Sequence, residues 1–557
     1  MAMQGDGLSI WNAESFGETL VDWSVGELLA RQARARADHL ALVYHQPERQ
    51  LRWTYAELLA RVERLARGLV ELGIGHGDKV AVLAPNLPEW IVLEFACATI
   101  GATLVTVNTN SRADELGHVL RQADVQALFL VEAFRGNAYA DMVQALDRTA
   151  YPALLHCVLM DGADRPGFLN LAGVEAGGAA VSDASFAARK AAVGAGDVFQ
   201  IQFTSGTTGT PKGAMISHGA AVNNARFFAG RAGLDADDRL ASAMPLFHTA
   251  AGIMELLGVV AQGATLLKAI AFDAETMLEL LHHERATVIS AVPTMFTAML
   301  QHPRQLAREF DTSALRGLIT GGTSIPVPLM ERMHAELGAL PTIGFGMTEC
   351  SPMVTGTRAG DSFELKSATV GTALPHTALK VVGPDGEPTP VGQPGELCIR
   401  GYLLTQGYYR MPERTREAID AEGWLHSGDL ATLDAQGYVR IVGRIKDMII
   451  RGGENLYPAE IENFLLRHPA VRQAQVVGVP DPYMGEEAVA CVQLAEGATL
   501  GEDELRAYCR ERIARHKVPK YIRFVDAFPL TPSGKVKKYE LRARIAAELD
   551  ATRELQR

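Results

Sequence analysis

The chain has little cysteine, no excess of positive charge and no long run of purely apolar residues. Six of its 557 residues are cysteines, scattered without a C-x-x-C pair, which argues against a disulfide framework and against a zinc ribbon. The net charge of -12 disfavours a nucleic-acid-binding protein, because such proteins carry a basic surface. It does not exclude a small anionic ligand, since a local basic site can lie in an acidic protein.

Signals for secretion and membrane insertion are also lacking. The first residues, MAMQGDG, contain no basic region followed by an apolar run, so we expect no signal peptide and a cytoplasmic location. The most apolar stretch, residues 249–267, contains Glu255 and Gln262 and favours a buried core over a membrane span. Hydrophobic residues make up 48%, enough for a large globular core, and the length predicts about three to four structural units.

Helix and strand patterns alternate through the first part of the chain. Thr54 and Glu57 form a capping box, apolar residues then recur at helical spacing, and Gly73 supplies a stop. We expect a strand over 79–84, a helix over 89–100 and a strand over 102–107. Continuous apolar strands between helices predict parallel sheets covered by helices, which is an α/β fold.

The residue composition changes twice toward the C-terminus. Turn clusters at 384–388 and 390–394 precede a short strand at 396–400, which predicts a β-rich module. Beyond residue 442 we expect strands over 474–479 and 489–494 and a helix over 502–515. The predicted architecture is a large N-terminal domain over 1–443, with α/β subdomains and a β-rich subdomain, and a small α+β domain over 448–557. The boundary lies at 444–447.

The densest local signal is TSGTTGTPKG, from Thr204 to Gly213. Glycines let backbone N–H groups approach an anion, hydroxyls add donors, and Lys212 adds a positive charge. The segment is not the P-loop G-x-x-x-x-G-K-[ST], because Pro211 takes the place of the second glycine and Gly213 follows the lysine. The strand-like residues before it favour a phosphate-binding loop over a surface turn.

Two other segments place a carboxylate close to a turn. GFGMTEC, residues 344–350, contains Glu349, which could hold Mg²⁺ together with substrate phosphates or could be a solvated turn residue. WLHSGD, residues 424–429, contains Asp429, which could accept hydrogen bonds from ribose hydroxyls, although Gly-Asp turns are common. Neither segment decides the function alone.

Three more segments carry unusual residue combinations. GRIKDMIIRGG, residues 443–453, ends in two glycines that allow close backbone approach. TPSGKVKK, residues 531–538, places Lys535 on a turn, where a lysine cluster is otherwise a solvated face. PLFHTAAG, residues 245–252, sets His248 among apolar and small residues, where a satisfied core histidine is the alternative.

In their order along the chain, these segments resemble the adenylate-forming superfamily of acyl-CoA synthetases, adenylation domains and luciferases. The similarity covers about residues 24 to 545 and most resembles the medium-chain fatty acyl-CoA synthetases. It rests on TSGTTGTPKG, PLFHTAAG, GGTSIP, GFGMTE, WLHSGD, GRIKDMIIRGGENLYPAEIE and TPSGK.

The resemblance implies an AMP-forming carboxylic acid:CoA ligase that uses ATP, Mg²⁺ and coenzyme A. In such enzymes a carboxylate attacks the α-phosphate of ATP, pyrophosphate leaves, and the CoA thiol then attacks the acyl-AMP and releases AMP. We expect a medium-chain fatty acid as the substrate. A bulky aromatic or alicyclic acid, or the loading of a carrier protein, is the alternative, and a homodimer would be usual for the family.

The resemblance also assigns nucleotide-binding and catalytic roles. ATP and AMP would contact Thr204, Ser205, Gly206, Thr207, Thr208, Gly209, Lys212, Gly321, Gly322, Thr323, Phe345, Gly346, Asp429 and Arg444. The catalytic residues would be Lys535, Thr348 and Glu349, of which Glu349 would also hold Mg²⁺. Phe345 stands where the family usually has tyrosine, which removes a hydroxyl but keeps a ring to stack on adenine.

Substrate binding and domain movement complete the implied assignment. The acyl pocket would contain His248, Thr249, Gly252, Thr294, Met347 and Cys350, together with Gly322 and Gly346. No arginine or lysine lies in these segments, so we do not expect a dicarboxylate. Lys446 would be the hinge of a mobile C-terminal domain, and Arg451, Gly452 and Gly453 would line a tunnel for CoA.

Overall fold

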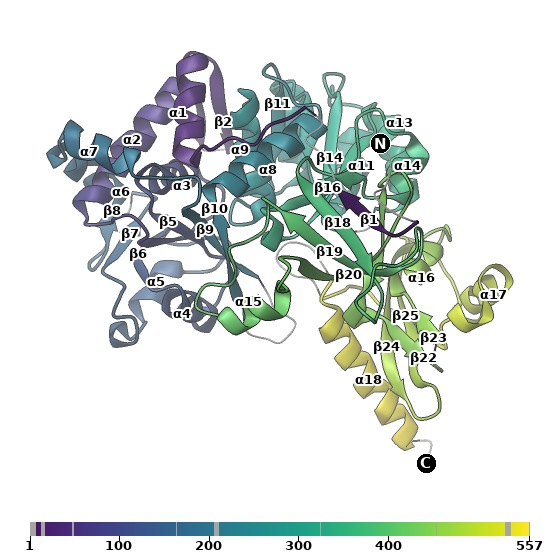
Figure 1. The fold of residues 1–557 in the computed structure, drawn as a ribbon. Coiled ribbons are helices and arrows are strands. Elements are labelled where there is room, and N and C mark those ends of the chain that lie inside the picture. The colour runs from purple at the N-terminus through teal and green to yellow at the C-terminus, as the bar shows by residue number, and fades with distance from the viewer. Residues whose placement is uncertain are drawn as a thin grey trace.

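The computed structural model of the chain describes residues 7–12, 17–46, 49–162, 164–204, 211–323, 325–452, 454–529 and 536–555, with side chains up to residue 549. Two large sheets with helices between and around them form most of the molecule. An antiparallel β-rich unit and a small α+β unit follow at its C-terminal end (Figure 1). The expected α/β class with a β-rich subdomain is confirmed.

The first sheet has seven strands in the order β10-β9-β5-β4-β6-β7-β8. All neighbours are parallel except β10, which pairs with β9 in the antiparallel sense. Its central strands are buried almost throughout because helices cover both faces. The strands are β4 (Lys79–Leu83), β5 (Thr103–Thr106), β6 (Val125–Leu130), β7 (His156–Leu159), β8 (Leu169–Asn170), β9 (Val198–Thr204) and β10 (Lys212–Ser217).

The second sheet has nine strands in the order β17-β16-β15-β14-β13-β11-β12-β2-β3. Its centre is parallel and its two edges are antiparallel. The strands are β2 (Leu40–Gln46), β3 (Arg49–Thr54), β11 (Arg239–Ser242), β12 (Thr265–Ala269), β13 (Val288–Ser290), β14 (Gly317–Gly321), β15 (Pro341–Gly346), β16 (Met353–Gly356) and β17 (Thr372–Ala373).

Five helices lie between these two sheets and form one apolar core with both. They are α1 (Val25–Ala35), α2 (Tyr55–Glu71), α3 (Pro88–Ile100), α8 (His218–Arg231) and α9 (Leu256–Gln262). The predicted capping box of Thr54 and Glu57 begins α2. Helix α3 is buried on almost every side, as expected for a helix that is apolar all round.

The remaining helices cover the outer faces and the edges of the sheets (Figure 1). They are α4 (Ala113–Gln122), α5 (Tyr139–Gln144), α6 (Leu171–Gly177), α7 (Asp183–Ala191), α10 (Ala274–His283), α11 (Pro293–Gln301), α12 (Pro303–Leu306), α13 (Val327–Leu337), α14 (Phe363–Ala368) and α15 (Pro412–Ala418). The apolar stretch at 249–267 forms a π-helical segment, η3 (Ala250–Glu255), then α9 and most of β12. Within the described residues, no helix combines the length and the apolar character that a membrane span requires.

The β-rich unit is an antiparallel sheet in the order β1-β18-β19-β20-β21. Its strands are β1 (Ile10–Asn12), β18 (Thr377–Val382), β19 (Gly395–Gly401), β20 (Leu425–Leu433) and β21 (Val439–Arg444). Buried residues alternate with more exposed ones toward the end of β20, because one face of the sheet covers its own apolar cluster.

The C-terminal unit begins after a short 3-10 turn, η5 (Ile445–Asp447). It contains β22 (Ile449–Arg451), β23 (Glu454–Leu456), α16 (Pro458–Leu465), β24 (Val471–Asp481), β25 (Gly485–Leu494), α17 (Glu502–Arg512), β26 (Tyr521–Phe524) and α18 (Lys538–Leu555). The expected helix over 502–515 is too long, since Ile513 adopts extended backbone angles and ends α17 at Arg512. Whether this unit is a mobile domain hinged at 444–447 stays a prediction.

Candidate active site

The predicted phosphate-binding loop joins two antiparallel strands. Thr204 ends β9 and Lys212 begins β10, and these two residues face each other in the ladder. The predicted contacts Ser205, Gly206, Thr207, Thr208 and Gly209 lie outside the described residues. The loop is therefore anchored at both ends by one hairpin, and Lys212 Nζ lies 4.6 Å from the centre of the Tyr408 ring, in cation–π range.

Tyr408 connects this lysine to the predicted Mg²⁺ ligand. Its hydroxyl donates a hydrogen bond to Glu349 Oε1 at 2.8 Å. Burial, together with the charge of Glu349, raises the pKa of Tyr408 far above its usual value, so the hydroxyl stays protonated. The backbone around Tyr408 pairs with β10, where Tyr409 N donates to Gly213 O at 2.8 Å. Lys212, Tyr408 and Glu349 thus form one continuous group.

The motif GFGMTE runs from β15 into a 3-10 turn, η4 (Thr348–Cys350). Glu349 is only 7% exposed, and its backbone carbonyl accepts a hydrogen bond from Thr405 N at 2.7 Å. The alternative of a solvated turn glutamate is therefore wrong. Phe345 is half-buried against the apolar cluster of the β-rich unit.

Close backbone approach explains the glycines on the neighbouring strands. A Cβ atom at Gly321 would lie 2.3 Å from Gly344 O, and one at Gly346 would lie 2.0 Å from Pro352 O. Gly322 has a φ of +80°, which favours glycine, and Thr323 beside it is exposed. Side chains at Gly321 and Gly346 would therefore clash with these backbone oxygens.

Asp429 and Arg444 face each other on β20 and β21. Arg444 Nε donates to Asp429 Oδ1 at 3.0 Å. The aspartate side chain is 8% exposed and the arginine side chain 53%. The arrangement presents a buried carboxylate and a more exposed guanidinium at one edge of the β-rich unit, which suits a polar ligand that needs an acceptor and a cation.

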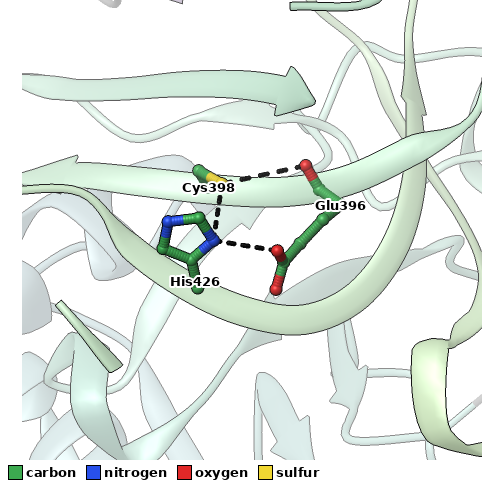
Figure 2. Close-up of side chains that lie close together, drawn as sticks. All are labelled: Glu396, Cys398 and His426. Atoms are coloured by element: carbon green, nitrogen blue, oxygen red, sulfur yellow. Dashed lines mark hydrogen bonds and ion pairs between the residues drawn. The ribbon is translucent and has the colours of Figure 1, made fainter. Parts of the chain in front are cut away.

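Glu396, Cys398 and His426 meet on the neighbouring strands β19 and β20, as Figure 2 shows. Their nitrogen, sulfur and oxygen atoms lie within 4.8 Å of one another, and such donors can bind zinc. However, Glu396 Oε2 lies 2.8 Å from His426 Nδ1, while Glu396 Oε1 accepts the Gly428 N–H at 3.0 Å. Burial raises the pKa of the Cys398 thiol to about 12. We assign Glu396 the role of holding the turn that precedes Asp429.

The predicted acyl-pocket residues differ in their surroundings. Thr249 and Gly252 belong to the buried start of η3, and the Thr249 hydroxyl has no hydrogen-bond partner in the described part of the chain. His248 Nδ1 accepts the Ala250 N–H at 3.2 Å, which gives it a structural contact. The other members are Cys350, which is buried with a raised thiol pKa because of burial, Met347, which is half-buried, and Thr294, which is exposed on α11.

The C-terminal unit places its predicted residues in three different settings. Lys446 lies in η5, where burial lowers its pKa and Arg444 lowers it further. Arg451 Nε donates to Glu487 Oε2 at 2.6 Å inside the unit, and Gly452 has a φ of +60°. Gly453 and Lys535 lie outside the described residues.

Lys537, directly before α18, donates a hydrogen bond from Nζ to Glu540 Oε1 at 2.8 Å. The hydrogen bond to Glu540 raises the pKa of Lys537, and Glu115 on α4 adds to the increase. The same helix α4 carries His118, whose Nε2 lies 3.2 Å from Pro211 O at the end of the predicted phosphate loop.

Sequence reasoning missed Tyr408 and Glu396. Tyr408 stands in QGYY, residues 406–409, which has no composition that singles it out. Its role depends on pairing with β10, which lies about 190 positions earlier. Glu396 was assigned only to a strand, and its contacts to His426 and Gly428 arise from the antiparallel register of β19 and β20.

Comparison with known proteins agrees with this geometry. Residues 29–409 match the family model of the AMP-binding enzymes, and residues 460–535 match the model of the AMP-binding enzyme C-terminal domain. The chain is 43% identical to the putative acyl-CoA synthetase YngI of Bacillus subtilis, covering 94% of this chain and 97% of the relative. It is 37% identical to the mitochondrial medium-chain acyl-CoA ligase ACSF2 of Rattus norvegicus, covering 95% of this chain and 89% of the relative.

A solved structure supports the same relationship. The anthranilate CoA ligase AuaEII in complex with anthranoyl-AMP superposes with a TM-score of 0.84 at 25% identity, covering 95% of this chain and 99% of the other. The chain belongs to the AMP-binding enzyme family, in its acyl-CoA synthetase branch.

Proposed function

We propose that this acyl-CoA synthetase activates a medium-chain carboxylic acid. ATP and the acid form acyl-AMP and pyrophosphate, and CoA then displaces AMP to give the acyl-CoA. The observation that carries the proposal is the contact of Lys212 with the buried pair of Tyr408 and Glu349, which links the phosphate loop to a carboxylate suited to Mg²⁺. The similarity to a medium-chain acyl-CoA ligase supports the proposed length of the acyl chain of the substrate.

The nucleotide would lie across the ends of the two sheets. Thr204, Lys212 and the loop between them would hold the β- and γ-phosphates, because hydroxyl, amide and ammonium donors together suit a polyphosphate. Phe345 would stack on adenine, and Gly321, Gly322 and Thr323 would border it. The Asp429 carboxylate would accept hydrogen bonds from the ribose hydroxyls beside Arg444.

The donor set around Glu349 fits Mg²⁺. This ion takes one or two carboxylates together with substrate phosphates, and Glu349 is a buried carboxylate held by Tyr408. When bound, Mg²⁺ would neutralise part of the phosphate charge. Thr348, in the same turn, would contact the α-phosphate.

The two half-reactions would use two orientations of the C-terminal unit. Lys535 would stabilise the charge that develops on the α-phosphate and the attacking carboxylate. Rotation at Lys446 would then bring Arg451, Gly452 and Gly453 to the CoA tunnel.

An aromatic acid is the second candidate substrate, because the similar solved structure is an anthranilate CoA ligase with anthranoyl-AMP bound. Loading of a carrier protein is the alternative for the second step. The six cysteines are all buried and free, which suits a reducing compartment such as the cytoplasm.

A panel of acids tests the proposal. Straight-chain acids from acetate to palmitate, with aryl and alicyclic acids, are supplied with ATP, Mg²⁺ and CoA, and AMP and acyl-CoA are followed by mass spectrometry. Maximal turnover at middle chain lengths would support the medium-chain assignment. Turnover with ring acids alone would show that the substrate is an aromatic or alicyclic acid and not a medium-chain acid. Acyl-AMP that accumulates without forming a CoA ester would favour a carrier protein as the acyl acceptor.

A further inference from the structure

The segment that presents Asp429 is a bulge in the β-rich sheet. The register of β19 and β20 places three residues of β20, 427–429, opposite Leu397 alone. Gly428 in this bulge has a φ of +71°, a left-handed conformation that favours glycine. The hydrogen-bond ladder is interrupted where a strand bulges, so other groups must hold these three residues in place.

Strand β19 supplies the groups that hold the bulge. Glu396 Oε1 accepts the Gly428 N–H at 3.0 Å, and Ser427 Oγ donates to Leu397 O at 2.6 Å. The Asp429 N–H in turn donates to Ser427 Oγ at 3.0 Å. The position of Asp429 therefore depends on where the Glu396 carboxylate is held.

His426 places one ring nitrogen against each of two carboxylates. Its Nδ1 lies 2.8 Å from Glu396 Oε2, as Figure 2 shows, and its Nε2 lies 3.5 Å from Asp420 Oδ2. A neutral imidazole carries hydrogen on one nitrogen and a lone pair on the other, whereas an ionised carboxylate only accepts. The neutral ring would therefore turn a lone pair toward one carboxylate. The protonated ring has a hydrogen for each of them.

Asp420, in the segment between α15 and β20, is ionised at neutral pH. Burial by itself would raise the pKa of Asp420, but hydrogen bonds from the Trp424 and Glu422 N–H groups lower it below its usual value. Lys380 and His426 lower this pKa further. Oδ1 accepts both N–H groups at 2.9 Å, while Oδ2 faces the imidazole. A protonated His426 thus connects this turn to Glu396.

Two further ionisable groups belong to the same cluster, Cys398 on β19 and Lys380 on β18. Cys398 Sγ lies 3.6 Å from His426 Nδ1, but burial raises the pKa of the thiol to about 12, so it stays neutral. Lys380 acts on Asp420 and on Cys398, and its Nζ lies 4.7 Å from the centre of the Trp424 ring. Histidine is the side chain whose ordinary titration range includes neutral pH.

We infer that the proton on His426 sets the affinity for ATP, because it holds Glu396 and through it the bulge that presents Asp429. His426 is a positioning residue and does not touch the nucleotide itself. Loss of the proton breaks the connection between Asp420 and Glu396 and weakens the hydrogen bond from Gly428. The inference rests on the proposed function, because it takes Asp429 as the contact to the ribose.

The test measures the dissociation constant of ATP with Mg²⁺, without acid or CoA, by titration calorimetry from pH 6 to 8.5. In the wild type this Kd should rise about threefold as His426 loses its proton. His426→Gln removes the charge and should show the high Kd at every pH. His426→Arg keeps a permanent cation and should show the low Kd at every pH. Dividing each Kd by that of His426→Arg at the same pH cancels the titration of ATP.

Three more variants make the test specific. Asp420→Asn keeps an acceptor for the N–H groups but removes the charge beside His426 Nε2, so the rise in Kd should move to lower pH. It decides the question on its own if a His426 variant does not fold. His45→Gln removes another histidine near a carboxylate, 4.0 Å from Glu279, and should match the wild type at every pH. Asp429→Asn should raise Kd at every pH.

A wild-type Kd that keeps a constant ratio to that of His426→Arg from pH 6 to 8.5 would overturn the inference. An equally high Kd in His426→Arg and His426→Gln would also overturn it, because the shape of the ring and not its charge would then matter. In both cases a raised Kd in Asp429→Asn would leave the proposed function intact. An unchanged Kd in Asp429→Asn would contradict the proposed nucleotide site and, with it, the inference.

Discussion

The hydroxyl of Tyr408 donates to Glu349 Oε1 at 2.8 Å, and both side chains are buried. The two residues are separated by 59 positions in the sequence. Strand β10 brings them together, because the backbone around Tyr408 pairs with it. Lys212, at the start of that strand, lies over the Tyr408 ring. A change at Tyr408 should therefore affect the carboxylate and the phosphate loop together.

Tyr408→Phe should reduce kcat/KM for ATP–pyrophosphate exchange about tenfold or more, because a buried carboxylate loses a charge-assisted hydrogen bond. Tyr409→Phe is the matched control, since the Tyr409 hydroxyl contacts Asp124 at 3.4 Å instead, and it should stay near the wild-type rate. Equal rates for Tyr408→Phe and the wild type would show that Glu349 works without this donor.

Asp429→Asn and Arg444→Gln should each raise KM for ATP about tenfold, because each removes one member of a charged pair. The double variant should lose less than the product of the two single effects, since residues in direct contact are not independent. KM for ATP is measured in the wild type, the two single variants and the double variant, which completes a double-mutant cycle. Strictly multiplicative effects would mean that the two side chains act separately.

Glu396 should act as a positioning residue for Asp429. Glu396→Ala should raise KM for ATP about threefold while kcat changes little, because the Gly428 N–H loses its acceptor. Glu396→Gln keeps an acceptor and should restore most of the affinity. Cys398→Ser should have little effect, and a strong loss of activity in that variant or after chelation of zinc would favour a metal site instead.

Lys535→Ala should abolish acyl-AMP formation, with a fall of about 10²–10³ in kcat, and should spare thioester formation from preformed acyl-AMP. Lys446→Pro should harm the thioester step more than the adenylation step, because it restricts the proposed hinge. The two half-reactions are measured separately by pyrophosphate exchange and by single turnover of acyl-AMP. Equal losses in both steps for either variant would contradict the division of roles.

His218 should make the fold sensitive to acid. Burial lowers its pKa from 6.5 to about 4, and its Nδ1 accepts the Val25 N–H at 3.1 Å. The unfolded chain therefore binds this proton more readily than the folded chain. The contribution of neutral His218 to the free energy of unfolding is complete above pH 6.5. It falls by about 3 kcal/mol as the pH drops toward 4.

His218→Asn keeps an acceptor near the position of Nδ1 and removes the titrating group. The difference in free energy of unfolding between the wild type and this variant should shift in favour of the variant between pH 6.5 and 4. Denaturant unfolding at several pH values measures it. A constant difference over that range would mean that His218 does not titrate on unfolding.

By itself the sequence determined the family, the α/β class and the order of the motifs, because these depend on local composition and on spacing along the chain. Thr54 and Glu57 could be identified as a cap, and residues 79–84 as a buried strand, from their neighbours alone. The sequence indicated the carboxylate of Glu349 as a metal ligand. It did not indicate that this side chain is buried.

The tertiary structure alone decided which distant residues meet. Tyr408 reaches Glu349 only because the strands bring their segments together, and Glu94 comes next to Gly252 only because α3 packs against η3. Glu94 follows a purely helical pattern in the sequence, and its hydrogen bond from Gln200, 106 positions away, exists only in the folded chain. Contacts between positions far apart depend on the packing of whole elements, which local patterns do not encode.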